Sequence, residues 1–146
     1  MQYTKDDYDA WNERKYQIHS TAHHKFVKVR RVCLVESGLN AGAEQNGSID
    51  RDNDSFLRFY IILKVFNEKG FWGVPMTTAT LTESSNVHLV NYVVNKDRQM
   101  ENVVVLLKQL KCIDTKRVVE GRTNVGTISL GDFAMIVKKI KNIFPT

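Results

Sequence analysis

The sequence has no apolar stretch that approaches the ~20 residues needed for a membrane-spanning helix. Its first residues are acidic and lack the apolar core of a secretory signal peptide. Only two cysteines occur, Cys33 and Cys112, and no Cys-x-x-Cys or Cys/His spacing indicates a metal site or a disulfide framework. Both lie in apolar stretches, so we expect them to be buried and reduced. These absences predict a cytoplasmic protein without a membrane span.

The common catalytic signatures are also missing. The sequence contains no Gly-x-Ser-x-Gly, His-Glu-x-x-His, Gly-x-x-x-x-Gly-Lys-Ser/Thr or Gly-x-Gly-x-x-Gly motif. Its four histidines lie outside any recognisable catalytic triad. These absences leave open an active site that is assembled from residues dispersed along the chain.

Positive charge is what the sequence has in excess. The 146 residues carry a net charge of +5, and with 42% hydrophobic and 25% charged residues they suit one globular domain over residues 1–146. The basic residues gather in residues 25–31 and 108–122. This distribution suits a phosphate-rich partner. A solvated basic surface would explain the charge equally well.

The hydrophobic pattern predicts a β-rich α+β protein. Thr4 and Asp7 suit the start of a helix over residues 5–19, and Ser129 suits the start of a second helix near the C-terminus. Between them we expect about five strands, the last of them buried on both sides: residues 26–35, 57–66, 71–78, 87–94 and 103–113. This order indicates a small barrel or half-barrel with a helix packed on it.

Polar residues beside these strands are the candidates for chemistry. Arg58 and Lys64 share one face of the alternating strand over residues 57–66. The planar guanidinium of Arg58 suits a phosphate, although a solvated or salt-bridged strand residue is the alternative. Thr77 and Thr78 stand at a strand end, where their hydroxyls can donate to phosphate oxygens or serve only as turn residues.

Four stretches in order resemble segments of the PemK/MazF family of toxins from bacterial toxin–antitoxin pairs. Residues 38–47 (GLNAGAEQNG) are similar to that family's G-x-N-x-G-x-E-Q-x-G. Residues 56–67 are similar to its F-x-R-P strand that ends in K-x-F-N, and residues 72–78 to its G-x-P-L-T-T. Residues 109–117 are similar to its S-Q-x-R-x-I-D-x-K-R-L. The resemblance covers roughly residues 8–144.

The resemblance implies an SH3-like small barrel of the PemK/Kid toxin type, with residues 1–22 as the helical N-terminal extension of longer members. It also implies a homodimer that cuts single-stranded RNA at short sequences without a metal or cofactor. In this family the 2′-hydroxyl of the RNA attacks the adjacent phosphate and leaves a cyclic phosphate and a free 5′-hydroxyl. A cognate antitoxin, expected to be acidic and partly disordered, would neutralise the toxin.

The resemblance assigns roles by position. Arg58 is similar to the family's essential arginine, which assists proton transfer and neutralises charge on the transition state. Thr77 is similar to the threonine that binds the scissile phosphate, and Thr78 to its helper. Further residues are expected to bind the RNA around the cleft, although structural hydrogen bonding is an equal alternative for those that would read bases: Glu44, Gln45, Lys64, Lys108 and Gln109.

The sequence departs from the family pattern at two positions. Phe59 stands where the family has proline after the arginine, and Lys108 stands where a serine or an acid is usual.

Two alternatives to the nuclease therefore stay open: a relative that only binds RNA or antitoxin, and a topoisomerase inhibitor on the same fold, like the CcdB proteins. Arg58 and Thr77 favour the nuclease, because a topoisomerase inhibitor has no need of them.

Overall fold

The computed structural model describes residues 3–41, 48–50, 55–77, 87–95 and 98–145. Its elements, in chain order, are α1 (Lys5–Thr21), β1 (Arg31–Glu36), β2 (Ser48–Asp50), β3 (Ser55–Val65), β4 (Gly70–Thr77), β5 (Val87–Asn95), β6 (Arg98–Val105), the 3-10 turn η2 (Leu107–Gln109), β7 (Lys111–Asp114), the 3-10 turn η3 (Thr115–Arg117), β8 (Gly126–Thr127) and α2 (Leu130–Ile143).

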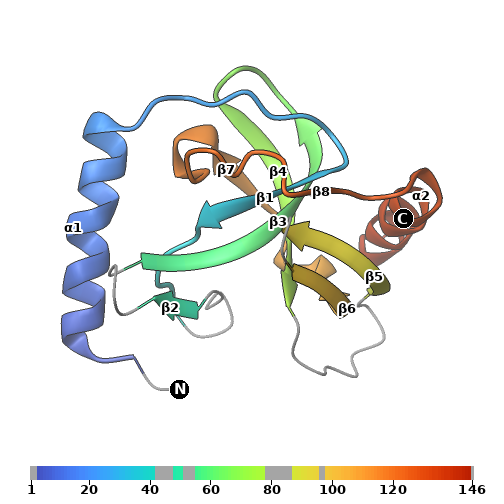
Figure 1. The fold of residues 1–146 in the computed structure, drawn as a ribbon, viewed down its shortest axis with the longest axis horizontal. Helices are drawn as coiled ribbons and strands as arrows, with labels where there is room; N and C mark the ends of the chain where they lie inside the picture. Colours follow the sequence, from blue (N-terminus) through green and yellow to red (C-terminus); the bar gives the residue numbers. More distant parts are fainter. Residues whose placement is uncertain (1–2, 42–47, 51–54, 78–86, 96–97, 146) are drawn as a thin grey trace.

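The strands form one curled antiparallel sheet, which confirms the predicted half-barrel (Figure 1). The strand order is β5-β6-β4-β3-β1-β8, while β2 pairs with β3 and β7 pairs with β4. β4 is central because three strands pair with it. β3 runs along one of its edges, and β6 and β7 share the other edge at Met76–Thr77 and at residues 70–73, respectively.

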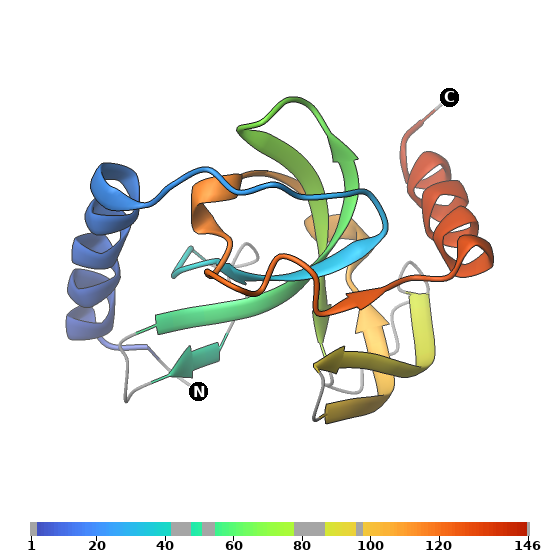
Figure 2. The same ribbon diagram turned by 45° about the horizontal axis from the view of Figure 1, so that its top comes forward.

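Both predicted helices are present, and their first turns show why they begin where they do. The Thr4 hydroxyl accepts from the Asp7 N–H at 3.2 Å, and the Asp7 carboxylate accepts from the Thr4 N–H at 2.8 Å. This reciprocal pair satisfies two backbone donors that a helix start leaves open. The Ser129 hydroxyl caps α2 by accepting from the Asp132 N–H at 3.2 Å. The two helices lie at opposite ends of the sheet (Figures 1 and 2).

The prediction of one strand over residues 103–113 is wrong. The chain forms β6, turns through η2, and returns to the same edge of β4 as β7. The 3-10 turn closes with the Leu110 N–H donating to the Leu107 carbonyl at 3.3 Å. The polar residues Lys108 and Gln109 lie in this turn, but the apolar residues on both sides of it carry the same hydrophobic signal, so the pattern also fits one strand.

The predicted strand over residues 26–35 begins later than expected, at Arg31. Arg30 has a left-handed backbone with a φ of 74°, which interrupts any extended run at that point. Its N–H donates to the Ile62 carbonyl at 2.9 Å, and its Nε donates to the Ile128 carbonyl at 3.0 Å. Residues 22–29 instead cross over the sheet between α1 and β1 (Figures 1 and 2).

Hydrophobic clusters cover both faces of β3. Ile61 belongs to a larger cluster that also contains Val74 of β4 and Ile136 of α2. Tyr60 and Ile62 point the other way, into a second cluster. Alternation along the strand therefore separates two cores, and the face that carries Arg58 is apolar for most of its length.

The expectation that both cysteines are buried holds for only one of them. Cys33 is buried in the second cluster, and burial raises the pKa of its thiol to about 12. Cys112 is exposed on β7, opposite Trp72 in the strand register. It lies on the outward face of an edge strand, which an apolar neighbourhood in sequence does not reveal.

Among the helices of the described ranges, none combines the length and the apolar character needed to cross a bilayer.

Candidate functional site

Arg58 lies on the face of β3 between two apolar groups. On one side is Phe56, whose ring packs edge-on against Trp11 of α1 at 5.7 Å and against Tyr3 at 6.4 Å. On the other side is Tyr60, which is fully buried. The alternation of a strand puts residues 56, 58 and 60 on one face, so the Arg58 stem is flanked by aromatic rings.

The Arg58 guanidinium is only partly neutralised by its surroundings. Its Nη1 donates to the Met76 carbonyl at 3.3 Å, and its buried Nε has no hydrogen-bond partner among the described residues. None of the ion pairs found within the described ranges involves Arg58. Burial lowers its pKa from the ordinary value, a shift that the nearby Tyr60 and Tyr3 oppose. A half-buried cation held by a carbonyl is suited to receive an anion.

Thr77 ends β4 next to the atom that holds Arg58. The Met76 carbonyl precedes it directly in the chain, and Thr77 pairs with Val104 of β6. The pairing of Tyr60 with Pro75 fixes the β3–β4 register. This pair is the last of the β3–β4 ladder, and Arg58 and Thr77 each lie two residues beyond it. The hydrogen bond from Arg58 to the Met76 carbonyl brings the predicted guanidinium to the backbone next to the predicted threonine.

Lys108 and Gln109 lie in η2, beside the end of β4. The Leu106 N–H donates to the Pro75 carbonyl at 3.0 Å, which fixes the start of this turn two residues from Thr77. Lys108 is exposed and Gln109 is half-buried. The residues of η2 therefore border the end of β4 from the edge opposite to β3.

Lys64 is not grouped with Arg58. The β3–β4 register shifts between Ile62 and Lys64, and after this irregularity Val65 joins Ile62 in the second cluster. The shift leaves Lys64 exposed on the opposite face, where it pairs with the outward-facing Trp72. A bulge of this kind reverses the side-chain alternation, and strict period-two counting misses it. Three other predicted site residues lie outside the described residues: Glu44, Gln45 and Thr78.

Two cations that contact the Tyr60 and Trp11 rings were not among the predicted site residues. Lys111 of β7 places its Nζ 5.5 Å from the centre of the Tyr60 ring. Arg117 of η3 donates to the backbone carbonyls of Glu36 and Ser37 and lies 5.6 Å from the Trp11 ring centre. Burial lowers the Arg117 pKa, and Tyr60 is the first of the groups that oppose this shift. Both cations belong to the basic stretch over residues 108–122 and to residues 109–117, which carry part of the family resemblance, and either signal could have pointed to them.

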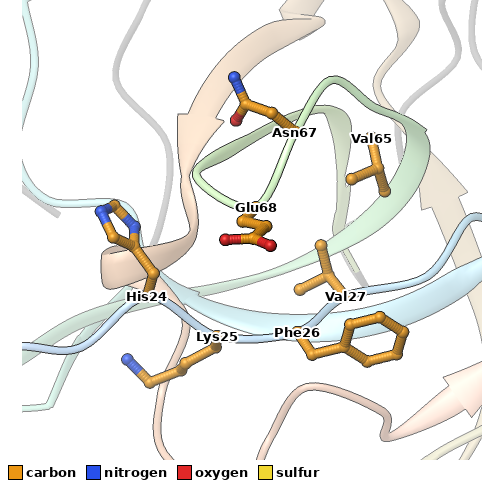
Figure 3. Close-up of a pocket in the computed structure, with 7 residues that line it drawn as sticks. All are labelled: His24, Lys25, Phe26, Val27, Val65, Asn67 and Glu68. Carbon is orange, nitrogen blue, oxygen red and sulfur yellow. The ribbon is translucent and has the colours of Figure 1, made fainter.

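Two grooves of the described surface lie away from Arg58. A groove of about 480 Å³ forms where residues 24–27 pass over the β3–β4 hairpin, and its polar lining includes His24 and Glu68 (Figure 3). His24 Nδ1 lies 3.2 Å from an Asp114 carboxylate oxygen. A second groove, of about 620 Å³, runs between α1 and residues 116–120. Neither of these two grooves is lined by a predicted site residue.

Comparison with known proteins gives this chain no family: no family model matches it, and a search of curated proteins finds no significant match.

Proposed function

We propose that this protein is a metal-independent endoribonuclease that cuts single-stranded RNA at the Arg58–Thr77 site. The observation that carries the proposal is the half-buried Arg58 guanidinium, held by the Met76 carbonyl beside Thr77 and free of carboxylate contacts among the described residues. Burial makes this charge costly, and a phosphate group would neutralise it.

The surroundings of the site favour a polyanion over a single small anion. Lys111 places its Nζ 5.5 Å from the centre of the buried Tyr60 ring, and Arg58 lies two residues from Tyr60 on the same strand. A third cation, Arg117, lies 5.6 Å from the Trp11 ring centre. Aromatic groups alternate with these cations, as in sites that bind an unpaired nucleic acid strand. The net charge of +5 would add long-range attraction for RNA.

The proposed reaction uses groups of the RNA, groups of this site and solvent water. The 2′-oxygen gives its proton to water as it bonds to phosphorus, the bond from phosphorus to the 5′-oxygen breaks, and the 5′-oxygen takes up a proton from water. Arg58 would stabilise the charge that develops on the phosphate oxygens, and the Thr77 hydroxyl would donate to one of them. Arginine is a poor general base because it stays protonated, so charge stabilisation is its main role.

The resemblance to PemK/MazF toxins supports this proposal and extends it to an SH3-like barrel, a homodimer and an inhibitory antitoxin. The departure at Phe59 is compatible with the fold. Phe59 pairs with Leu34 of β1 and packs against the larger core, so it fills a place within the sheet. Lys108 adds an exposed cation where the RNA is expected.

The test is cleavage of a mixed-sequence RNA in the presence of EDTA. We expect the wild-type protein to produce 2′,3′-cyclic phosphate ends. Arg58→Ala and Thr77→Val should both retain the fold but cleave RNA about 10²–10³ times more slowly, the typical cost of losing a fixed donor to developing charge. Arg58→Lys keeps the charge but loses the planar fork, so it should recover only part of the activity.

Three results would oppose the proposal. RNA that is bound but left intact would indicate a binding protein without catalysis. Inhibition of a topoisomerase without RNA cleavage would favour a CcdB-like function. Cleavage that Arg58→Ala leaves unchanged would place the chemistry elsewhere in the molecule.

A further inference from the structure

Lys111 reaches the Arg58 face of the sheet across a glycine. In the β4–β7 ladder Lys111 pairs with Gly73, and in the β3–β4 ladder Gly73 pairs with Ile62. A Cβ atom at Gly73 would lie 3.3 Å from Cδ1 of Tyr60 and 3.1 Å from Cε2 of Phe71. The missing side chain leaves the Tyr60 ring next to the strand that carries Lys111.

The Lys111 ammonium group is therefore placed beside the aromatic ring that also neighbours Arg58. Its Nζ lies 5.5 Å from the Tyr60 ring centre, and the side chain is half-buried. Arg58 lies two residues from Tyr60 on the same face of β3, which corresponds to about 7 Å along the strand. The two cations thus both neighbour Tyr60 on one face of the sheet.

We propose that Lys111 binds the phosphate next to the scissile phosphate in the bound RNA strand. This inference rests on the proposed function, because it takes Arg58 and Thr77 as the site of the scissile phosphate. An extended strand carries one negative charge per nucleotide, so a second cation along its path contacts a second phosphate. A lysine contact of this kind positions the strand without reading its sequence.

The first experiment measures binding of a single-stranded 2′-deoxy oligonucleotide, which has no 2′-hydroxyl and is not cut by this route. The logarithm of the affinity is plotted against the logarithm of the salt concentration for wild type and Lys111→Ala. Loss of one phosphate contact should reduce the slope by about 0.7 for a single strand. Lys138→Ala, which removes the same charge from an exposed position on α2, should leave the slope unchanged.

The second experiment locates the phosphate. RNA substrates carry one neutral methylphosphonate at each position around the cleaved bond. At one adjacent position, the neutral group should weaken cutting by wild type but add no further loss to Lys111→Ala. Lys111→Arg should behave as wild type, because it keeps the charge.

The outcomes separate the two proposals. An unchanged salt slope for Lys111→Ala, with thermal unfolding like that of wild type, would overturn the Lys111 site even if RNA is cut. A reduced slope in a protein that leaves RNA intact would support phosphate binding at Lys111 and reject the nuclease. Equal losses from Lys111→Ala and Lys138→Ala would show that only net charge matters, which also overturns the site.

Discussion

Two partly buried arginines at the two sides of the Phe56–Trp11 contact are neutralised in different ways. On the α1 side, Arg14 Nε and Nη2 donate to the two Glu36 carboxylate oxygens at 2.7 and 2.8 Å. On the β4 side, Arg58 donates to one carbonyl, that of Met76, at 3.3 Å. The hydrogen bond and charge of Glu36 raise the Arg14 pKa, whereas burial lowers the Arg58 pKa.

This difference indicates that the charge of Arg14 has a structural role, whereas the charge of Arg58 is available to a ligand. A bidentate carboxylate uses both the charge and the geometry of the guanidinium, so Arg14 serves to fasten α1 to the end of β1. A carbonyl offers only a partial charge, so Arg58 keeps most of its attraction for an anion. The comparison predicts that changes on the α1 side affect stability, and that changes on the β4 side affect RNA.

The largest loss of stability is expected for Gly38→Ala on the α1 side. Gly38 has a φ of 76°, and a Cβ atom there would overlap Cε2 of Trp11. Backbone strain and displacement of the indole together should lower the free energy of unfolding by about 3 kcal/mol or more.

Urea denaturation measures this loss, and the chain offers a matched control for it. Gly121 has a similar φ of 75°, but a Cβ atom there would meet no other atom within 4 Å. Gly121→Ala therefore reports the backbone strain alone, about 1–2 kcal/mol. Equal losses for the two variants would mean that Trp11 does not press against Gly38.

A smaller loss of stability is expected for Arg14→Ala, which leaves the buried Glu36 carboxylate without its two hydrogen bonds from the guanidinium. The Glu36 side chain is only 9% exposed, whereas that of Arg14 is 40% exposed. Because solvent screens the arginine side of the pair, we expect a loss of about 2 kcal/mol in the free energy of unfolding.

The exposed pair between Lys5 and Asp9 on the same helix provides the control for Arg14. Lys5→Ala should change the free energy of unfolding by less than about 0.5 kcal/mol. Neither variant should alter the salt dependence of oligonucleotide binding. A loss of RNA affinity in Arg14→Ala, with stability unchanged, would reverse the roles assigned to the two arginines.

The sequence predicts the local features of this comparison but not the contacts between distant residues. The apolar alternation of residues 57–65 and the caps at Thr4 and Ser129 depend on neighbours in the chain, and the structure has the expected strand and helices. The contact between Trp11 and Gly38 joins positions that are 27 residues apart. Nothing in the composition around either residue indicates that they meet.

The same limit applies to the candidate site. The hairpin that joins β3 to β4 is predictable from the sequence and brings together the strand ends that carry Arg58 and Thr77. The one-residue shift between Ile62 and Lys64 prevents residue counting from giving the exact register at that end. The position of Lys111 depends on the turn at η2, which divides a stretch whose apolar residues on both sides predict a single strand. The shift after Ile62, which separates Lys64 from Arg58, leaves no trace in the hydrophobic pattern.

The smallest change in stability, and the sharpest contrast with Arg14, is expected for Arg58→Met. Methionine keeps the long unbranched stem that packs beside Phe56 and Tyr60, but it removes a buried charge and the unpartnered Nε. Since replacing a poorly compensated buried charge by an apolar group is often neutral or favourable, the free energy of unfolding should stay unchanged or rise by about 1 kcal/mol. RNA cleavage should be lost in the same variant. Urea denaturation and the cleavage assay on one preparation test both statements, and a loss of more than about 2 kcal/mol would identify Arg58 as a structural residue like Arg14.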